Sequence, residues 1–414
     1  MIRRIQALNY RCLRFVDIPL GARRVLVGPN GSGKSALISA FTLLRDLVRR
    51  GPDAAVARHA GALRDMASVS SAARVARAGD VFRDLVWRRP AADPRFELAV
   101  ELELPEETRE MLPEERRYGT YRYEVALAGD EDGVAIRAEK GILESRREAA
   151  EADQAYLFPD LPEPPATILT RSRAGARTVL SKSAAGMDRF YVEQDPRGWI
   201  TDIALGPKRS ALGNLPESSD TLPASTFAKG VLESAVIRLC PRPSAMRRPC
   251  SPAFPDEALL VSGTNLACVV RRLRGEHREA FDEWLGLLRG ALPGLQDIHV
   301  TRRKADRHRY LTLTYRGGLD MPSWLLSGGT LRLLALTLPA FLSRARGIYL
   351  VEEPERGIHP DALAALHASL FSIPGGQVIA TTCSSVLQQF FRPDEVLRFE
   401  CGRDGATRIS RGQA

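Results

Sequence analysis

Eight residues near the start of the chain have the types and spacing of a phosphate-binding loop. They read Gly28-Pro29-Asn30-Gly31-Ser32-Gly33-Lys34-Ser35 and fit the pattern G-x-x-x-x-G-K-[ST]. In such a loop, backbone N–H groups close around phosphate oxygens, and the following helix contributes the partial positive charge of its N-terminus. Lys34 would then reach the β- and γ-phosphates, while the Ser35 hydroxyl would ligate Mg²⁺. The loop therefore predicts binding of a nucleoside triphosphate together with Mg²⁺.

The elements on either side of this loop match the same prediction. Val25 to Val27 form a short apolar run that predicts a buried strand. Apolar residues between Leu37 and Val48 recur at helical spacing and predict a helix directly after the loop. The alternative, a glycine-rich turn without a ligand, is disfavoured because strand, loop and helix occur in the required order.

Three further motifs lie close to the C-terminus. Leu326 to Thr330 precede an apolar helical stretch from Leu331 to Leu342. A predicted buried strand from Ile348 ends in carboxylates at Glu352, Glu353 and Glu355. Residues 377–384 form another apolar run that ends in small polar residues.

Each of these motifs offers a defined chemistry. Ser327, with the amides of Gly328 and Gly329 at a helix start, makes a second anion-binding cap. Glu352 at the strand end is suited to hold Mg²⁺, and Glu353 to orient and deprotonate a hydrolytic water. Taken singly, the Ser327 motif would be better explained as a helix N-cap, and the alternative for Glu352 and Glu353 is a solvated strand end. Their order along the chain favours the nucleotide site.

These motifs resemble the ABC-type ATPases of the SMC, RecF and OLD-like group, within the AAA family. The compact stand-alone ATPases of bacterial phage-defence and DNA-maintenance operons are the most similar members. The resemblance covers residues 1–50 and 320–400, and extends more thinly through 8–11, 263–266 and 306–310.

The resemblance implies a homodimer, or a higher homo-oligomer, in which two heads sandwich two ATP molecules head to tail. Ser327 and Gly329 of one subunit would cap the γ-phosphate held by the loop of the other. His359 would lie in a loop that crosses the dimer interface, although a plain surface turn explains it almost as well. The expected nucleotide contacts are Asn30, Gly31, Ser32, Gly33, Lys34, Ser35, Ala36, Arg11, Ser327, Gly328, Gly329 and Cys383.

The sequence departs from the family pattern in two places. The last strand of the family normally ends in a histidine that contacts the γ-phosphate, and here that position is Cys383. Because a neutral thiol is a weak hydrogen-bond donor, we expect slow ATP hydrolysis, with ATP acting more as a clamp than as fuel. The glutamine that usually bridges loop and Mg²⁺ after the first helix is not found.

The pattern of elements predicts an α/β fold. We expect a P-loop NTPase with an ABC-type ATPase head, consisting of a mixed β-sheet core flanked by helices, an antiparallel β-subdomain and an inserted helical lobe. Residues 1–143 are predicted to carry the first half of the head, and 144–165, rich in proline and charge, an exposed linker. Residues 166–320 are predicted to form an inserted, Arg-rich lobe, and 321–414 the second half of the head.

Composition sets broader limits. The net charge of +9 fits a polyanionic partner, but only six of the 59 basic residues are lysine, a bias that genome composition also explains. The six scattered cysteines form no C-x-x-C pair and are expected to be reduced. Without an apolar run of roughly 20 residues or a signal-peptide core, we expect a cytoplasmic protein with no membrane partner.

We therefore expect an ATP-dependent sensor or scaffold that controls a separate effector, a nuclease or toxin, in anti-phage defence. About 60 residues follow Glu353 in the sequence, so the effector is expected on another polypeptide. DNA is a candidate partner, and Arg271, Arg272 and Arg274 are secondary candidates for contacts with it. The alternatives are a RecF-like repair or replication factor and, less favoured, a transporter ATPase subunit. The candidate DNA contacts are Arg302, Arg303, Lys304, Arg307 and Arg309.

Overall fold

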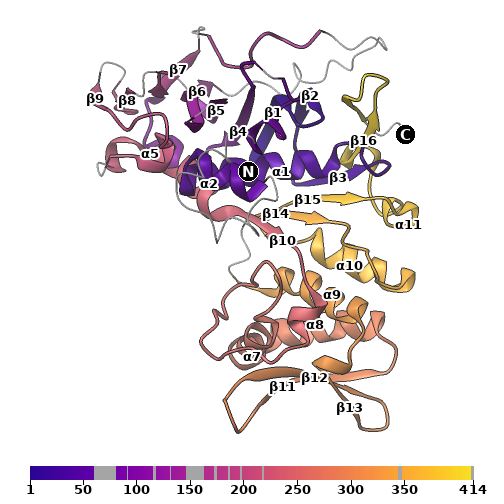
Figure 1. Cartoon of the computed structure of the whole chain (residues 1–414). Helices are drawn as coiled ribbons and strands as arrows, with labels where there is room; N and C mark the ends of the chain where they lie inside the picture. The colour runs from indigo at the N-terminus through magenta and orange to yellow at the C-terminus, as the bar shows by residue number, and fades with distance from the viewer. Residues whose placement is uncertain are drawn as a thin grey trace. The chain divides into compact units, whose positions relative to one another are not determined.

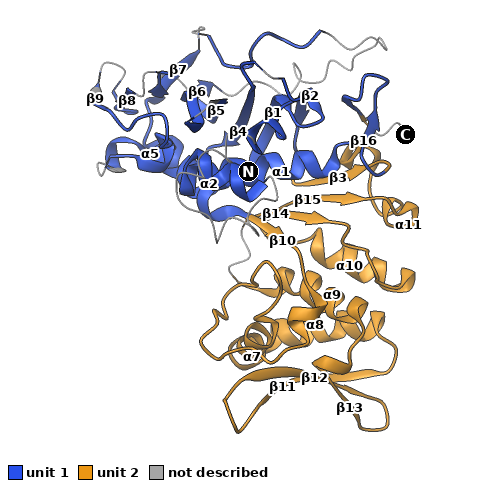
Figure 2. Cartoon of the chain, in the orientation of Figure 1, with its two compact units in different colours: residues 1–21, 30–236, 399–409 blue, residues 22–29, 237–398, 410–414 orange. Residues whose placement is uncertain are grey.

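A computed structural model divides the chain into two compact units, coloured separately in Figure 2. Unit 1 comprises residues 1–21, 30–236 and 399–409, and unit 2 comprises 22–29, 237–398 and 410–414. The structure describes residues 1–59, 81–90, 92–114, 118–130, 132–145, 163–171, 175–184, 187–195, 198–216, 219–343 and 347–411.

Unit 1 is built on an eight-stranded sheet with the order β2-β1-β4-β5-β6-β7-β8-β9 (Figure 1). Every neighbouring pair of strands runs antiparallel. This is the antiparallel β-subdomain that we expect from the sequence, in which Phe96 to Leu104 alternate apolar and charged residues. The strands are β1 (Ile2–Tyr10), β2 (Leu13–Pro19), β4 (Arg95–Glu103), β5 (Tyr118–Asp130), β6 (Gly133–Ser145), β7 (Ala176–Lys182), β8 (Asp188–Tyr191) and β9 (Trp199–Ile203).

Helices α1 (Lys34–Arg50), α2 (Pro52–His59) and α5 (Pro223–Gly230) pack against this sheet, while α4 (Glu106–Glu110) contacts α5. Helix α1 buries the apolar positions that the sequence pattern predicts, from Leu37 to Val48. It contacts β1 and α2, so its position is set by tertiary packing as well as by its own propensity.

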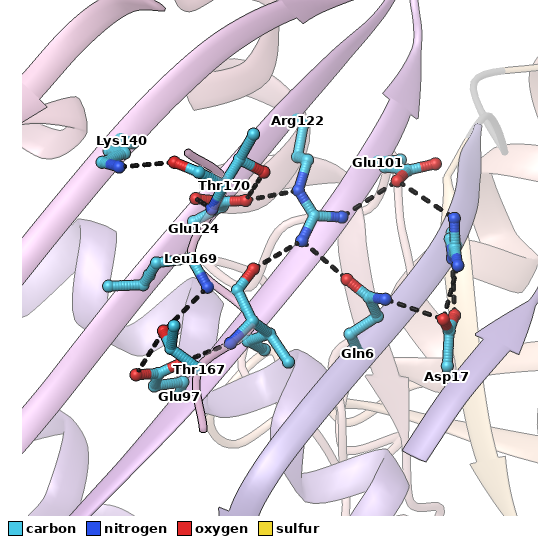
Figure 3. Close-up of polar contacts among 12 residues, drawn as sticks. Gln6, Asp17, Glu97, Glu101, Arg122, Glu124, Lys140, Thr167, Leu169 and Thr170 are labelled. Atoms are coloured by element: carbon cyan, nitrogen blue, oxygen red, sulfur yellow. Dashed lines mark hydrogen bonds and ion pairs between the residues drawn. The ribbon is translucent and has the colours of Figure 1, made fainter. Parts of the chain in front are cut away.

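The eight-stranded sheet of unit 1 carries a polar network on strands β1, β4 and β5 (Figure 3). The Arg122 guanidinium donates to Glu101 at 2.9 Å and to Gln6 at 2.6 Å, and Glu124 also accepts from it. Glu124 and Glu97 accept backbone N–H groups from Thr170 and Ile168, respectively. Charge-assisted bonds of this kind satisfy groups that would otherwise be costly to bury. They hold residues 167–170 across the sheet.

Unit 2 contains a largely parallel sheet in which β10 (Val236–Leu239), β14 (Ile348–Glu352), β15 (Gln377–Thr382), β3 (Arg23–Val27) and β16 (Val396–Cys401) are neighbours in that order. Strand β3 is parallel to both β15 and β16, and β14 is parallel to β15. Beyond Arg398 the chain continues into unit 1 as the tip of a hairpin with β17 (Thr407–Arg411). The inner strands β14 and β15 are almost entirely buried, as expected for a sheet covered on both faces.

The rest of unit 2 is a helical layer and a small antiparallel sheet (Figure 1). The sheet order is β11-β12-β13, and α7 and α8 pack against it. Trp284 of α8 is fully buried, and its indole N–H donates to Thr337 of α9 at 2.9 Å. The elements are α6 (Pro243–Met246), α7 (Leu266–Glu276), α8 (Arg278–Ala291), β11 (Leu295–Arg302), β12 (Arg309–Tyr315), β13 (Leu319–Pro322), α9 (Gly328–Thr337), α10 (Leu363–Leu370) and α11 (Ser385–Gln388).

Two regions of the sequence need separate mention. The predicted linker 144–165 lies largely outside the described residues, as does most of 51–80. Residues 166–320, predicted as one lobe, are divided between the units: β7 to β9 extend the sheet of unit 1, and the residues from 237 onward belong to unit 2. Strand β7 pairs with β6 of the first half of the chain, and β10 is the neighbour of β14, which follows much later in the sequence. Local periodicity does not reveal these two pairings.

Within the described ranges, no helix has both the length and the apolar character needed to cross a membrane.

Candidate functional site: two halves of a nucleotide site

The carboxyl ends of three parallel strands meet at one edge of the unit 2 sheet. In the strand register, Glu352 of β14 lies beside Thr381 of β15, and Thr382 lies beside Val27 of β3. The next residues along the chain are Glu353, Cys383 and Gly28. In open α/β sheets, ligands bind outside the carboxyl ends of the strands. The fold thus brings the start of the glycine-rich loop, the carboxylates and Cys383 to the edge where a ligand is expected.

The loop residues from Asn30 onward belong to unit 1. Gly31 and Gly33 have φ values of 80° and 103°, in the left-handed region that favours glycine. A Cβ atom on Gly33 would lie 2.1 Å from the Thr407 hydroxyl oxygen. That hydroxyl donates to the Ser32 carbonyl at 3.0 Å. Glycine at position 33 is therefore required both by its backbone conformation and by its close approach to β17.

The N-terminus of α1 suits an anionic ligand. Gly33 is its N-cap, and no side chain caps the helix. The first-turn N–H groups of a helix have no partners within the helix, so they are donors that a phosphate can use. Among the described residues, the buried Ser32 hydroxyl has no hydrogen-bond partner. Lys34 and Ser35 occupy the first two positions of the helix, next to these donors.

The two predicted catalytic carboxylates have different surroundings. Glu352 accepts a hydrogen bond at 2.6 Å from Arg238 of β10. Glu353 has a left-handed backbone with φ of 46°, and its N–H donates to the Thr381 carbonyl at 3.0 Å. Its own carbonyl accepts from Arg332 of α9 at 2.8 Å. An unusual backbone conformation held on both sides is a common feature of functional residues.

Sequence reasoning gave no role to Glu355, the third carboxylate of the run. One of its carboxylate oxygens accepts the Thr382 hydroxyl, and the other is buried without a hydrogen-bond partner among the described residues. A buried carboxylate oxygen without a donor is uncommon and calls for a donor, an ion or a water. The repeated acid in Glu-Glu-Pro-Glu was the signal for this residue.

The second predicted anion cap has a different local structure. The Ser327 hydroxyl accepts the Thr330 N–H at 3.0 Å and is the N-cap of α9. A Cβ atom on Gly329 would lie 1.9 Å from the Gly357 carbonyl oxygen. Glycine at 329 therefore permits direct packing of the segment after Glu355 against the start of α9. Ser327 itself is exposed.

Arg11 and Cys383, the two remaining predicted nucleotide contacts, lie in different parts of the structure, and Arg11 is the first of them. The Arg11 guanidinium donates to the His59 carbonyl at 2.5 Å, and Arg11 has a left-handed φ of 51°. His59 in turn contacts Asp46: burial alone would raise the pKa of that carboxyl, but the hydrogen bond from His59 and the charge of Arg45 lower it below its usual value. This places Arg11 beside α2.

The second is Cys383, which, like His359, is exposed in unit 2. Cys383 is a free thiol directly after β15. The His359 Nδ1 atom accepts the Asp361 N–H at 3.3 Å and caps a short 3₁₀ helix, Pro360–Ala362. This local cap accounts for His359 without a partner chain.

The two groups of arginines proposed to contact DNA differ in their pairing. Arg271, Arg272 and Arg274 each form ion pairs, with Asp256, Glu257, Glu276 or Asp297. At the end of β11 and in the turn that follows it, no carboxylate among the described residues pairs with Arg302, Lys304 or Arg307, whereas Arg303 lies 3.6 Å from Asp306. Arg309 is half-buried and donates toward Cys268. Positive charge without a carboxylate partner is thus concentrated in the turn.

Comparison with known proteins adds three findings. Residues 253–387 match a family described as "AAA domain, putative AbiEii toxin, Type IV TA system". An OLD nuclease of Thermus scotoductus (strain ATCC 700910 / SA-01) is 46% identical over 44 residues, a segment that spans 11% of this chain and 8% of that protein. A crystal structure of an Smc head bound to the C-winged helix domain of ScpA has a TM-score of 0.50 with 13% sequence identity.

The likeness to that Smc head covers 99% of this chain and 97% of that one. The likeness to the SMC head domain from Thermotoga maritima covers 100% of this chain and 99% of that one, with 11% sequence identity and a lower TM-score of 0.43. At such identities, the first likeness bears on the fold alone. It agrees with the predicted α/β fold and its large antiparallel sheet.

Together, the family match, the local sequence match and the fold support one class of protein, an SMC/OLD-like ABC-type P-loop ATPase. The resemblance predicted from the sequence is thereby confirmed.

Proposed function

We propose that this chain binds ATP with Mg²⁺ and that ATP joins two copies of it head to tail. The observation that carries the proposal is the loop before α1, with two left-handed glycines and a helix start that no side chain caps. Such a loop presents backbone donors for phosphate oxygens, and Lys34 adds a fixed positive charge.

The residues of this chain then have separate roles. Asn30 to Ala36 hold the phosphates, and the Ser35 hydroxyl, with Glu352, serves Mg²⁺. Within the described residues, no cluster of three or more His, Cys, Asp or Glu is arranged for a metal. That agrees with Mg²⁺ chemistry, since this ion commonly takes one or two protein ligands and completes its shell with phosphates and water. Glu353 is the proposed base that accepts a proton from the attacking water.

Hydrolysis is proposed to be slow because a thiol stands where relatives carry an imidazole. Cys383 cannot donate a strong hydrogen bond to a developing phosphate charge. A steady-state turnover assay tests this: wild type should hydrolyse well below one ATP per second, and Cys383→His should be about 10-fold or more faster. Turnover well above one per second in the wild type contradicts the slow-clamp proposal. Glu353→Gln, expected to be inactive, controls for contaminating ATPases.

In this proposal, the ATP-joined dimer is a sensor or scaffold that acts through a separate effector in anti-phage defence. The family that residues 253–387 match is described as "AAA domain, putative AbiEii toxin, Type IV TA system", and the relative matched over 44 residues is an OLD nuclease. One description names a toxin and the other a nuclease, which supports linking this chain to a toxin or nuclease partner. Affinity purification with Glu353→Gln and ATP should enrich one such effector, and Lys34→Ala should lose it.

DNA is proposed to bind at the β11–β12 turn, with Arg302, Arg303, Lys304, Arg307 and Arg309 as the contacts. The pairing pattern supports this surface over α7, because Arg302, Lys304 and Arg307, which have no carboxylate partner among the described residues, can exchange solvent counterions for phosphates. Fluorescence anisotropy with a labelled duplex should show affinity falling steeply between about 50 and 200 mM salt.

A matched pair of variants sharpens the DNA test. Arg302→Ala with Arg307→Ala should weaken binding and flatten its salt dependence, whereas Arg271→Ala should change neither, since Arg271 is already paired with Asp256 at 2.7 Å. Equal effects of both changes would reject the assignment of this turn.

A further inference from the structure

Two buried thiols in unit 2 lie side by side. The Sγ atoms of Cys250 and Cys268 are 3.2 Å apart, and the two residues are 2% and 0% exposed. Both are free cysteines. A disulfide bond requires about 2.05 Å between sulfur atoms, so the two Sγ atoms need to approach each other by about 1 Å for a bond to form.

The surroundings of the pair distinguish the two sulfur atoms. The hydrogen bond from Cys250 lowers the pKa of the Cys268 thiol; burial opposes this, and the Arg309 guanidinium, 3.9 Å away, reinforces it. The hydrogen bond to Cys268 and burial together raise the pKa of Cys250. One sulfur is therefore suited to react as a thiolate while the other retains its proton, the division of roles that thiol oxidation to a disulfide uses.

The pair also joins elements that support the Ser327 loop. Cys250 exchanges two backbone hydrogen bonds with Arg309 of β12, at 2.8 and 2.9 Å. Three residues earlier, the Arg247 guanidinium donates to the Leu326 carbonyl, and the Arg247 carbonyl accepts from Ser323. Cys268 lies in the first turns of α7. A bond between the two sulfurs would tie this supporting segment to α7.

We infer that Cys250 and Cys268 form a redox site that a hydroperoxide converts to an intramolecular disulfide. The Cys268 thiolate attacks the peroxide, whose O–O bond breaks, giving a sulfenic acid and hydroxide. The Cys250 sulfur then displaces the sulfenic oxygen, which leaves as water with the Cys250 proton, and the S–S bond forms. In total, two thiols and one hydrogen peroxide give one disulfide and two waters.

Burial determines how the reaction proceeds. Because both thiols are inside the unit, oxidation requires local opening of the loop before α7 and is slower than oxidation of the exposed Cys383 and Cys401. Once formed, the bond restricts the unfolded chain between positions 250 and 268 and raises the stability of unit 2. Only the further consequence, a stiffer Ser327 loop in the ATP-joined dimer, rests on the proposed function.

The experiment is oxidation of the whole chain with hydrogen peroxide, followed by alkylation and non-reducing peptide mapping. The expected result is a peptide pair linked through Cys250 and Cys268. The melting temperature should rise by several degrees on oxidation and return to its original value after reduction with dithiothreitol. Cys250→Ser should lose both effects, and Cys240→Ser should keep both. If Cys250→Ser does not fold, Cys268→Ala takes its place, and the wild-type peptide map stands regardless.

Two results would overturn the inference. One is the absence of the Cys250–Cys268 link after Cys383 and Cys401 have reacted completely. The other is a link that forms only in denaturant. Neither bears on the joining of two copies by ATP, which is measured separately by light scattering with ATP and Mg²⁺, so failure of this inference and failure of the proposed function are distinguishable.

Discussion

Two helix starts of this chain that contain glycine, at Gly33 and at Ser327, are built in opposite ways. Helix α1 begins after left-handed glycines and has no side-chain cap, whereas α9 begins with Ser327 capping its own Thr330 N–H. The first start therefore gains most from an anion. The second is capped by its own Ser327 side chain and, in the proposed dimer, would contribute to binding a phosphate held by another copy. The contrast teaches that two helix starts with similar sequences can differ in whether the hydrogen-bond acceptor for their N–H groups comes from their own side chain or from a ligand.

The largest expected effect is on the uncapped start. Lys34→Ala removes the charge next to the loop donors, and we expect turnover to fall by about 100-fold or more, with ATP-dependent assembly lost. Steady-state hydrolysis and light scattering measure the two effects. Since Lys34 lies at the start of α1, an unchanged circular-dichroism spectrum serves as the folding control. A Lys34→Ala variant with wild-type turnover would contradict the claim that the start of α1 binds the phosphates of ATP.

Next in size is Gly33→Ala. This change places a Cβ atom on the Thr407 hydroxyl and strains a left-handed backbone, so we expect about 2 to 3 kcal/mol of lost stability and weaker ATP binding. Chemical denaturation gives the first quantity and calorimetric titration the second. Gly31→Ala is the matched control, because no atom lies within 4 Å of the Cβ that this change adds and only the backbone strain remains. Equal losses in the two variants would remove the role assigned to Thr407.

At the capped start, Gly329→Ala should cost about 1 to 3 kcal/mol, since the new methyl group meets the Gly357 carbonyl and forces the chain apart. We expect the loss in the unfolding transition of the isolated chain, without ATP. Gly328→Ala, whose nearest neighbour would be a Pro243 side-chain atom at 3.5 Å, should be tolerated. If Gly329→Ala is as stable as the wild type, the close packing described for this segment is wrong.

The smallest effect is expected for Ser327→Ala. Loss of an N-cap costs about 1 kcal/mol, so the chain should remain folded and should still bind ATP at the loop of α1. Assembly with ATP should nevertheless weaken, because in the proposal Ser327 contacts the nucleotide of the other copy. Measuring ATP affinity and assembled mass on the same sample separates the two. Loss of ATP affinity in the monomer would contradict the division of roles between the two helix starts.

Much of this arrangement was predictable from the sequence. The loop at 28–35 and the carboxylates after Ile348 have local signatures, and the parallel strands β3, β14 and β15 place them by the general geometry of α/β sheets. What sequence could not reveal depends on long-range packing. Thr407 lies 375 positions from Ser32 yet holds its carbonyl, and Arg238 pairs with Glu352 from a strand more than 100 residues earlier. The pairing state of the arginines on α7 likewise depended on Asp256 and Asp297, which no spacing rule connects to them.

The measurement that tests the central claim most directly is molar mass by light scattering with ATP and Mg²⁺, comparing Glu353→Gln with Lys34→Ala. Blocking hydrolysis in Glu353→Gln should trap the assembled form, so its mass should double or rise further with ATP, while Lys34→Ala should not respond. A mass that never depends on nucleotide, in a Glu353→Gln variant that binds ATP, would contradict the claim that ATP joins two copies of this chain.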